Sequence, residues 1–413
     1  MSRPGNRFTT MKTTLVALAI LLLLCSAMPG CKKDPLSFQP TNTVAKNFVH
    51  VENMQLLDSN SQPLTLKGVN LGSWLLWEAW VWGGGLNSES WINQTLAART
   101  SDAYTNNFRE TIYKNYITRA DIQSIASLGL NSVRVPFNHK FFDEDGTDII
   151  YSRFEIIDSL IQWCTEFHLY IIPDFHALPG GQNPLFISDP DDTKVWDSDA
   201  DKAQAAKIWK AIATRYANNK IILGYDLVNE PSTSDDKGMV DLYMQLIQAI
   251  RSVDSNHLLI VEGNNYAQDF SIFNTILDNN QVFSFHFYPW LSASSSWPEK
   301  LKVYDDFARK VKVPMWCGEW GEMSIDDERN IKSLLSDPSR LFCGNAFWTW
   351  KKVGGSSSQP VCEIQVSDDW KHLVNDQNKT GSQSYEQIAD GFLQSVLFSN
   401  NVPNADMRTM LSQ

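Results

Sequence analysis

Apolar runs of strand length alternate with helix-length segments along most of the chain. The expected strands cover residues 66–71, 132–137, 170–175, 221–230, 257–262, 282–288, 314–320 and 344–350. The expected helices cover residues 118–128, 156–167, 201–216, 238–253, 297–310 and 385–398. Strands that alternate with helices are typical of a parallel sheet covered by helices. Eight of them in a chain of 413 residues predict an α/β protein with a single (β/α)8 TIM barrel.

A short β-hairpin is expected in front of the barrel, with strands at residues 51–57 and 64–66 around a turn at residues 58–61. We therefore expect one domain over residues 47–413. A doubly wound sheet is the alternative, but it would need a phosphate- or cofactor-binding loop. The sequence contains no Walker loop, dinucleotide fingerprint, HExxH or GxSxG motif, so the barrel is favoured.

The first 31 residues are typical of a targeting segment. Lys12 precedes an apolar run at residues 15–24, which is short for a membrane span and leads through small residues to Gly30 and Cys31. This resembles a bacterial lipoprotein signal peptide, with Cys31 as the lipidated residue and residues 32–46 as a polar tether. The expected location is the cell envelope, with the membrane contacted through the N-terminal lipid only. An uncleaved membrane anchor is the alternative.

Composition and cysteine content narrow the function classes. The formal net charge of −12 leaves no basic surplus to neutralise phosphates, so we expect no nucleic-acid partner. Beyond the targeting segment the cysteines are Cys164, Cys317, Cys343 and Cys362. They lack metal-ligand spacing, and four cysteines allow three pairings that the sequence cannot rank. The first three lie in apolar patterns and are expected to be buried thiols. The sequence gives no indication of the oligomeric state.

Polar and aromatic residues gather at the ends of the expected strands. The fourth strand ends in Asn229, Glu230 and Pro231, and Glu319 lies near the end of the seventh. Similar positions near other strand ends are occupied by Arg134, His176, His286, Tyr288 and Trp348. Each residue alone could have a structural partner, as buried histidines and strand arginines usually do. Active sites of (β/α)8 barrels form where the strands end. The occurrence of polar and aromatic residues at so many strand ends therefore favours a functional site.

The Asn229-Glu230-Pro231 motif, with Glu319 inside Trp316 to Gly321, resembles glycoside hydrolase family 5 over most of residues 51–400. The resemblance implies a retaining (β/α)8 enzyme, with Glu230 as general acid/base and Glu319 as nucleophile. It further implies that Arg134 bonds the nucleophile and that Asn229 contacts the sugar 2-hydroxyl. By the same resemblance, His176, His286 and Tyr288 line the subsite of the reacting sugar and Trp348 stacks on it.

Residues 70–78, 176–183 and 347–351 are similar to segments of the exo-1,3-β-glucanase branch of this family. In that branch, the residues that match Glu78 and Asn183 hold hydroxyl groups of the terminal glucose. The resemblance implies a β-glucan substrate with β-1,3 or β-1,4 linkages. The Trp-rich loop after Glu78 departs from the branch, so two interpretations remain. Trp77 or Trp82 stacks on sugar, or the loop packs as a lid on the barrel.

Double displacement at a sugar needs one protonated and one ionised carboxyl group, about 5–5.5 Å apart. We therefore expect a raised pKa for Glu230, to which the charge of Glu319 contributes, while Arg134 and Tyr288 keep Glu319 ionised. Two carboxyl groups suffice for this reaction, so no metal or organic cofactor is expected. Two alternatives stay open: a catalytically silent, surface-tethered glycan-binding lipoprotein, and a transglycosylase that uses the same site.

Overall fold

The computed structural model describes residues 43–354 and 359–413. The predicted signal peptide, Cys31 and most of the predicted tether lie outside these residues. In the described part of the chain, no helix combines the length and apolar character needed to cross a membrane.

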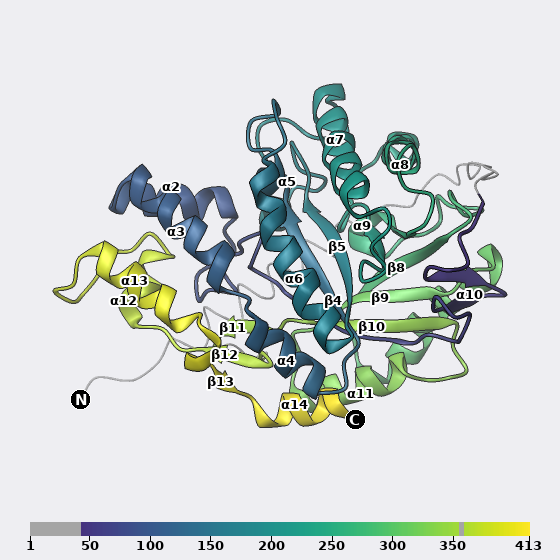
Figure 1. Ribbon diagram of the computed structural model, residues 1–413. Helices are drawn as coiled ribbons and strands as arrows, with labels where there is room; N and C mark the ends of the chain where they lie inside the picture. The colour runs from purple at the N-terminus through teal and green to yellow at the C-terminus, as the bar shows by residue number, and fades with distance from the viewer. Residues whose placement is uncertain (1–42, 355–358) are drawn as a thin grey trace.

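Eight parallel strands close into a barrel, in the order β10-β3-β4-β5-β6-β7-β8-β9 (Figure 1). They are β3 (Leu66–Asn70), β4 (Ser132–Asn138), β5 (Tyr170–Ala177), β6 (Gly224–Asp226), β7 (Leu258–Glu262), β8 (Gln281–Phe287), β9 (Met315–Gly321) and β10 (Phe342–Trp348). The predicted (β/α)8 barrel is therefore confirmed. Strand β6 is much shorter than the predicted segment 221–230, because pairing stops at Asp226 and the chain turns.

Helices surround the barrel and follow most strands. They are α2 (Glu89–Arg99), α3 (Asp102–Asn115), α4 (Arg119–Ser127), α5 (His139–Phe142), α6 (Phe154–Phe167), α7 (Asp199–Tyr216), α8 (Asp236–Arg251), α9 (Asn264–Ala267), α10 (Trp297–Val311), α11 (Ile325–Leu335), α12 (Asp368–Leu373), α13 (Tyr385–Ser395) and α14 (Ala405–Ser412). Side-chain caps define several beginnings: Thr118 and Asp121 form a capping box on α4, and Ser384 and Gln387 form one on α13. The six predicted helices are present, with ends shifted by up to three residues.

The N-terminal hairpin is tighter than predicted. Strands β1 (His50–Glu52) and β2 (Gln55–Leu57) pair antiparallel through Asn53 and Met54, both at positive φ. The predicted strand 51–57 is thus folded back on itself, and that boundary was wrong. The predicted turn at residues 58–61 is present, since the amide of Ser61 donates to the carbonyl of Asp58 at 2.9 Å.

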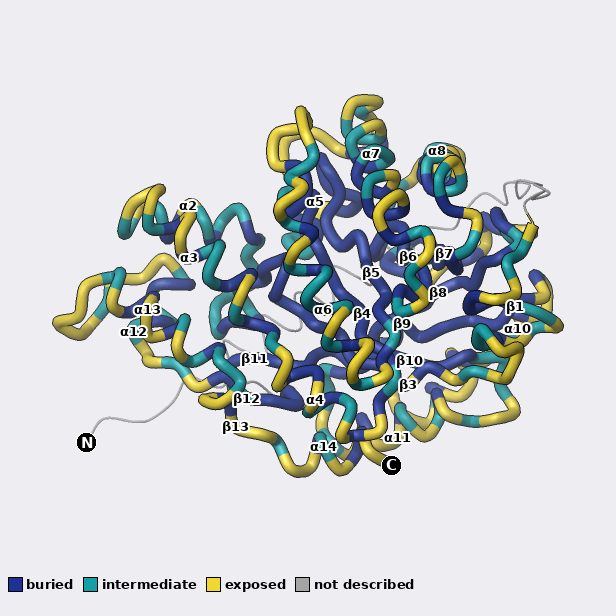
Figure 2. The backbone as a smooth tube through the Cα atoms, in the orientation of Figure 1, coloured by how far each residue is buried: buried dark blue, intermediate teal, exposed yellow. Residues whose placement is uncertain are grey.

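The barrel interior changes character from one end to the other. Alternate residues of a strand point the same way, so Leu258, Ile260 and Glu262 of β7 share a face. Leu258 and Ile260 belong to an apolar cluster that also includes Val49 and Leu56, which flank and form the N-terminal hairpin. Glu262, two residues further on, is a fully buried carboxylate. Strands β7 and β8 are buried along their whole length (Figure 2), and Glu262 and His286 lie toward their carboxyl ends.

Beside the barrel, helices α2, α3, α12 and α13 gather on one side of the molecule (Figure 1). A small sheet of β11 (Lys351–Val353), β12 (Cys362–Ile364) and β13 (Val402–Pro403) lies next to them. Trp370 and Phe392 stack there, with ring centroids 3.8 Å apart, and Trp82 packs on Phe392 at 4.9 Å. Trp77 and Trp82 are completely buried, so the interpretation that either stacks on sugar was wrong.

Cys164, Cys317, Cys343 and Cys362 are all free and buried. The expectation of buried thiols is confirmed for the first three and extends to Cys362. Burial raises the pKa of each of these thiols above its ordinary value.

Candidate active site

The residues predicted from strand ends lie at the carboxyl end of the barrel strands. Arg134 is on β4, His176 on β5, His286 on β8, Glu319 on β9 and Trp348 at the end of β10; Asn229 and Glu230 follow β6, Tyr288 follows β8, Glu78 follows β3 and Asn183 follows β5. This arrangement exists because all eight strands are parallel and their carboxyl ends share one face of the barrel. Glu230 and Glu319 retain 9% and 5% exposure, so both can be reached from outside.

Glu319 is held as an ionised group. Its Oε1 lies 2.5 Å from Arg134 Nη1, and its Oε2 accepts from the Tyr288 hydroxyl at 2.9 Å. Burial would raise the pKa of Glu319, but the positive charges of His286, Arg134 and His176 outweigh it and lower this pKa. The carboxylate is therefore charged at neutral pH and points into the site.

Glu230 has the opposite shift. Burial raises the pKa of Glu230, the contact with His286 opposes this, and the charges of Glu319 and Glu262 raise it further. Its Oε1 lies 2.7 Å from His286 Nδ1. The residue adopts a left-handed backbone with φ of +45°, a conformation that non-glycine residues adopt mainly where neighbouring contacts hold it. Glu230 therefore holds its proton to higher pH than an ordinary glutamate, whereas Glu319 loses its proton at lower pH.

The two carboxyl groups are close. One oxygen of Glu230, one oxygen of Glu319 and a ring nitrogen of His286 lie within 4.8 Å of one another. This close approach fits the separation of about 5–5.5 Å between carboxyl groups in double displacement better than the 6.5–9.5 Å of single displacement. A cation placed among these three groups would have to displace the contact between His286 and Glu230. The geometry fits acid-assisted nucleophilic displacement.

A layer of buried acids beneath the pair was not predicted from the sequence. The Arg134 guanidinium contacts Asp174 at 3.1 Å, Asp226 at 2.8 Å, Glu262 at 3.2 Å, Asn70 at 3.1 Å and Asn229 at 2.8 Å. Burial, followed by the charge of Glu262, raises the pKa of Asp226 well above its usual range. The sequence did contain a signal for Asp174, because this residue lies two positions before His176 and therefore on the same face of the strand.

His176 and Trp348 form a second wall of the site. The rings stack, with centroids 5.5 Å apart and planes 22° apart. His176 Nδ1 lies 2.7 Å from Asp174 Oδ2, and although burial lowers the pKa of His176, the charge of Asp174 leaves it raised. Gly72 makes room for Trp348, because a Cβ at this position would lie only 3.0 Å from the indole. The Trp348–Thr349 peptide bond is cis.

Glu78 lies on the Trp-rich loop, next to Glu230 and Glu319. It is buried, its Oε1 accepts from Trp80 Nε1 at 3.1 Å, and burial raises its pKa to about 7. The charges of His176, Glu319 and Glu230 also act on this pKa, which reflects their proximity. Trp80 is in turn fixed by Lys352, whose Nζ lies 4.3 Å from the indole centroid.

Asn183 holds the backbone of Glu230. Its Nδ2 donates to the Glu230 carbonyl at 3.0 Å, and its Oδ1 accepts from the amide of Leu185 at 2.9 Å. Neighbouring Gln182 donates to the carbonyls of His176 and Asn229 at 2.7 and 2.8 Å. The loop after β5 therefore fixes the loop after β6, and the Asn183 amide is already engaged at both ends.

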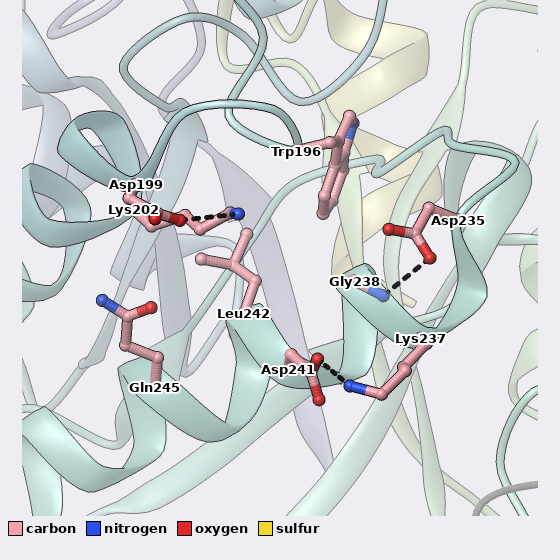
Figure 3. A pocket seen from close by; sticks show the side chains of 9 residues that line it. All are labelled: Trp196, Asp199, Lys202, Asp235, Lys237, Gly238, Asp241, Leu242 and Gln245. Carbon is pink, nitrogen blue, oxygen red and sulfur yellow. Dashed lines mark hydrogen bonds and ion pairs between the residues drawn. The ribbon is translucent and has the colours of Figure 1, made fainter.

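A separate polar pocket of about 380 Å³ lies between α7 and α8 (Figure 3). Its lining comprises Trp196, Asp199, Lys202, Asp235, Lys237, Gly238, Asp241, Leu242 and Gln245. None of the predicted site residues is among them. Ion pairs within the wall, such as Lys237 with Asp241, occupy several of its charged groups.

Comparison with known proteins agrees with this site. Residues 93–354 match the family model described as "Cellulase (glycosyl hydrolase family 5)". A β-xylosidase of Phanerodontia chrysosporium is 26% identical over 340 residues, covering 74% of this chain and 71% of the relative. Endoglucanase C of Acetivibrio thermocellus is 25% identical, covering 65% and 91%. A probable glucan 1,3-β-glucosidase A of Aspergillus clavatus is 24% identical, covering 97% and 94%.

Among solved structures, rutinosidase from Aspergillus niger aligns with a TM-score of 0.57 and 21% identity, covering 80% of this chain and 98% of that one. This likeness supports the barrel fold. The family resemblance expected from Asn229-Glu230-Pro231 and Glu319 is confirmed by the family model, which spans more than half of the chain. The chain is a member of glycosyl hydrolase family 5 and, with it, an O-glycosyl hydrolase.

Proposed function

We propose that this protein cleaves the β-glucosidic bonds of β-glucan, with β-1,3 or β-1,4 linkages, and retains the anomeric configuration. The observation that carries this proposal is the pair of Glu230 and Glu319. Their oxygens lie within 4.8 Å, and their pKa values are shifted in opposite directions. A pair with one protonated and one ionised carboxyl group is what double displacement needs.

In the first step, Glu319 attacks the anomeric carbon while the bond to the leaving oxygen breaks and Glu230 donates its proton to that oxygen. In the second step, Glu230 removes a proton from water, which attacks the anomeric carbon and frees Glu319. Arg134 and the Tyr288 hydroxyl hold Glu319 in line for attack, at 2.5 and 2.9 Å. They also disfavour its protonation before the attack.

A sugar bound in this site would lie among the side chains that surround Glu230 and Glu319. We propose that Trp348 supplies the stacking platform, that Asn229 contacts the 2-hydroxyl, and that His176 and Glu78 hold further hydroxyl groups. Asn229 Oδ1 is already bound by Arg134 at 2.8 Å, so its Nδ2 is the group that faces a ligand. Asn183 acts on the sugar through the loop of Glu230 that it fixes.

Support for a β-glucan substrate comes from the names of the relatives, which include an endoglucanase and a probable glucan 1,3-β-glucosidase. The β-xylosidase among them makes β-xylosides the natural comparison substrate. The test is release of reducing sugar from laminarin, carboxymethyl-cellulose and xylan, with the product profile followed over time. Release of glucose or short glucans supports the proposal. Release from xylan alone contradicts the choice of glucan.

The same assay separates the two alternatives. Tight binding of laminarin without release of sugar would identify a glycan-binding protein. Longer oligosaccharides formed in excess of free sugar would identify a transglycosylase. The presence of both Glu230 and Glu319 favours catalysis, because a binding protein has no need of two close acids whose pKa values are shifted in opposite directions.

We further propose that the protein is a cell-envelope lipoprotein, anchored through Cys31 and residues 32–46. The proposal rests on the apolar run at residues 15–24 followed by Gly30 and Cys31. N-terminal mass spectrometry of the membrane-extracted protein tests it. A diacylglyceryl group on Cys31 is expected, and a free, unlipidated Cys31 would contradict it.

A further inference from the structure

We propose that Glu262, at the end of β7, is a positioning residue of this active site. It holds His286 and the backbone of Glu230 so that the acid proton of Glu230 points toward the leaving group. This inference rests on the proposed function, in which Glu230 is the general acid.

Glu262 is rigidly placed. It is fully buried, and the Tyr243 hydroxyl bonds both its backbone groups, accepting from the amide at 3.1 Å and donating to the carbonyl at 3.0 Å. Its side chain contacts three parts of the site. Oε2 accepts from the Glu230 amide at 2.6 Å, while Oε1 lies 3.2 Å from Arg134 Nη2 and 3.2 Å from His286 Nε2.

His286 lies between two carboxyl groups, one at each ring nitrogen. Nδ1 faces Glu230 Oε1 at 2.7 Å, with Glu319 Oε2 at 3.6 Å, and Nε2 faces Glu262. Burial lowers the pKa of His286, but the charges of Glu262 and Glu319 and the contact with Glu230 raise it well above its usual range. These shifts favour an imidazolium, which carries a proton on each nitrogen: Nδ1–H donates to Glu230 Oε1, and Nε2–H faces Glu262 Oε1 as an ion pair at 3.2 Å.

This donor pattern decides where the proton of Glu230 lies. Because Nδ1–H donates to Oε1 of Glu230, the carboxyl proton is placed on Oε2. A neutral His286 with a bare Nδ1 would instead accept that proton and turn it away from the substrate. Glu262 prevents this by its negative charge at Nε2.

Protons are conserved in the first chemical step. As the glycosidic bond breaks, the proton of Oε2 moves to the departing oxygen and Glu319 forms its bond to the anomeric carbon. Glu230 becomes a carboxylate that the imidazolium already faces, so His286 and Glu262 neither gain nor lose a proton. The bond from the Glu230 amide to Glu262 also holds the left-handed backbone at φ +45°.

The test compares Glu262→Gln with wild type on two aryl β-glucosides. Phenyl glucoside needs protonation of its leaving group, whereas 2,4-dinitrophenyl glucoside does not. General acid catalysis contributes about 10²–10⁴-fold. We expect kcat/KM for phenyl glucoside to fall by about 100-fold or more and that for the dinitrophenyl substrate to stay within about threefold. Equal losses on both substrates, or no loss on either, would overturn the inference.

Asp278→Asn is the matched control. Asp278 is also a buried carboxylate bound to an arginine, Arg251, at 2.8 Å, but it precedes β8 at the opposite end of the barrel. Its replacement should leave both rate constants unchanged per folded molecule. A wild-type protein inactive on every glucoside and glucan would defeat the proposed function itself, and this inference with it. An active wild type with an unselective Glu262→Gln defeats this inference alone.

A measurement on the wild-type protein does not depend on how the variant folds. With ¹⁵N-histidine labelling, the His286 signals are identified by their absence in His286→Gln. At pH 7 both ring nitrogens of His286 should carry protons. A bare Nδ1 or Nε2 in the wild-type protein would contradict the proposed role of Glu262.

Discussion

At the scale of single residues, Arg134 acts with His286 and His176 to keep Glu319 ionised. Its guanidinium is completely buried and contacts Asp174, Asp226, Glu262 and Glu319. Burial and the charge of Glu262 raise the pKa of Asp226, and the single charge of Arg134 only partly offsets them. Removing one partner from such a buried network leaves the remaining charges uncompensated. The protonation states of the site therefore depend on this layer, and on Arg134 most of all.

Replacing Glu319 with alanine should abolish turnover and leave the fold intact. The nucleophile forms the covalent intermediate, so kcat on an aryl glucoside should fall by at least about 10³-fold. Circular dichroism and thermal unfolding should resemble those of the wild-type protein, because Arg134 keeps its other carboxylate partners. Normal turnover by Glu319→Ala would refute the nucleophile assignment.

Replacing Trp80 with phenylalanine should weaken substrate binding more than the chemical step. The change removes the indole N–H that donates to Glu78 at 3.1 Å and keeps an aromatic ring beside Lys352. Leaving a buried carboxyl oxygen without its donor costs about 1.5 kcal/mol, so we expect KM to rise about tenfold with kcat within about twofold. Trp163→Phe, on the outer helix α6, is the control. A loss confined to kcat would contradict the assigned role of Glu78.

At the scale of elements, the start of α2 connects the Trp-rich loop to the barrel. Glu89 is its first residue and is buried, with Oε2 accepting from the amide of Trp77 and from Asn138 Nδ2, both at 3.2 Å. Burial and the charge of Asp189 raise the pKa of Glu89 to about 7. This one acid therefore makes the stability of the helix junction depend on pH.

The sign of that dependence follows from proton binding. Below pH 4.5 Glu89 is protonated in both folded and unfolded chains. Between pH 4.5 and about 7 the unfolded chain releases the proton first, so stability decreases as pH rises. A shift from 4.5 to about 7 corresponds to about 3 kcal/mol.

Glu89→Gln removes this titration. Relative to wild type, the variant should gain up to about 3 kcal/mol in unfolding free energy between pH 5 and pH 8, measured by urea denaturation. Glu155→Gln, an exposed acid in the first turn of α6, should show no such trend. A difference between Glu89→Gln and wild type that is the same at both pH values would disprove the pKa argument.

Elements with a strong apolar period were predictable from the sequence, and those without it were not. The barrel strands and α6, α8 and α10 have clear patterns, whereas α2 buries Glu89 and Thr95 beside Ile92 and Leu96 and carries no apolar stripe. Helix α11 was missed even though Ser324 caps it and three acids follow in its first turn. Strand β6 was overestimated because apolar residues 227–228 continue its pattern after its pairing has ended.

The candidate site was predictable where residues lie at strand ends and hidden where they lie inside strands. Asp174 and Glu262 were read as parts of apolar strands. Each lies two residues from an inward-facing residue, His176 or Ile260, and therefore also faces the barrel interior. The role of Trp82 could not be read locally, because its partners Trp370 and Phe392 are about three hundred residues away in the sequence. Tertiary contacts of that range decide between a sugar platform and a core residue.

At the scale of the whole molecule, the two ends of the barrel have different tasks. The hairpin β1–β2 contributes to the apolar interior cluster at the amino ends of the strands, while the carboxyl ends hold the acids and histidines of the site. The aromatic cluster of Trp82, Trp370 and Phe392 joins the first barrel loop to the C-terminal helices. The loop that carries Glu78 and Trp80 is thus fixed by the chain's last hundred residues.

The stereochemistry of the product tests the central proposal most directly, because it depends on the separation and protonation of Glu230 and Glu319. Proton NMR during hydrolysis of a β-glucoside follows which anomer of the sugar forms first, before mutarotation mixes the two. The close spacing of the pair predicts the β-anomer as the first product. Initial formation of the α-anomer would contradict double displacement at this site.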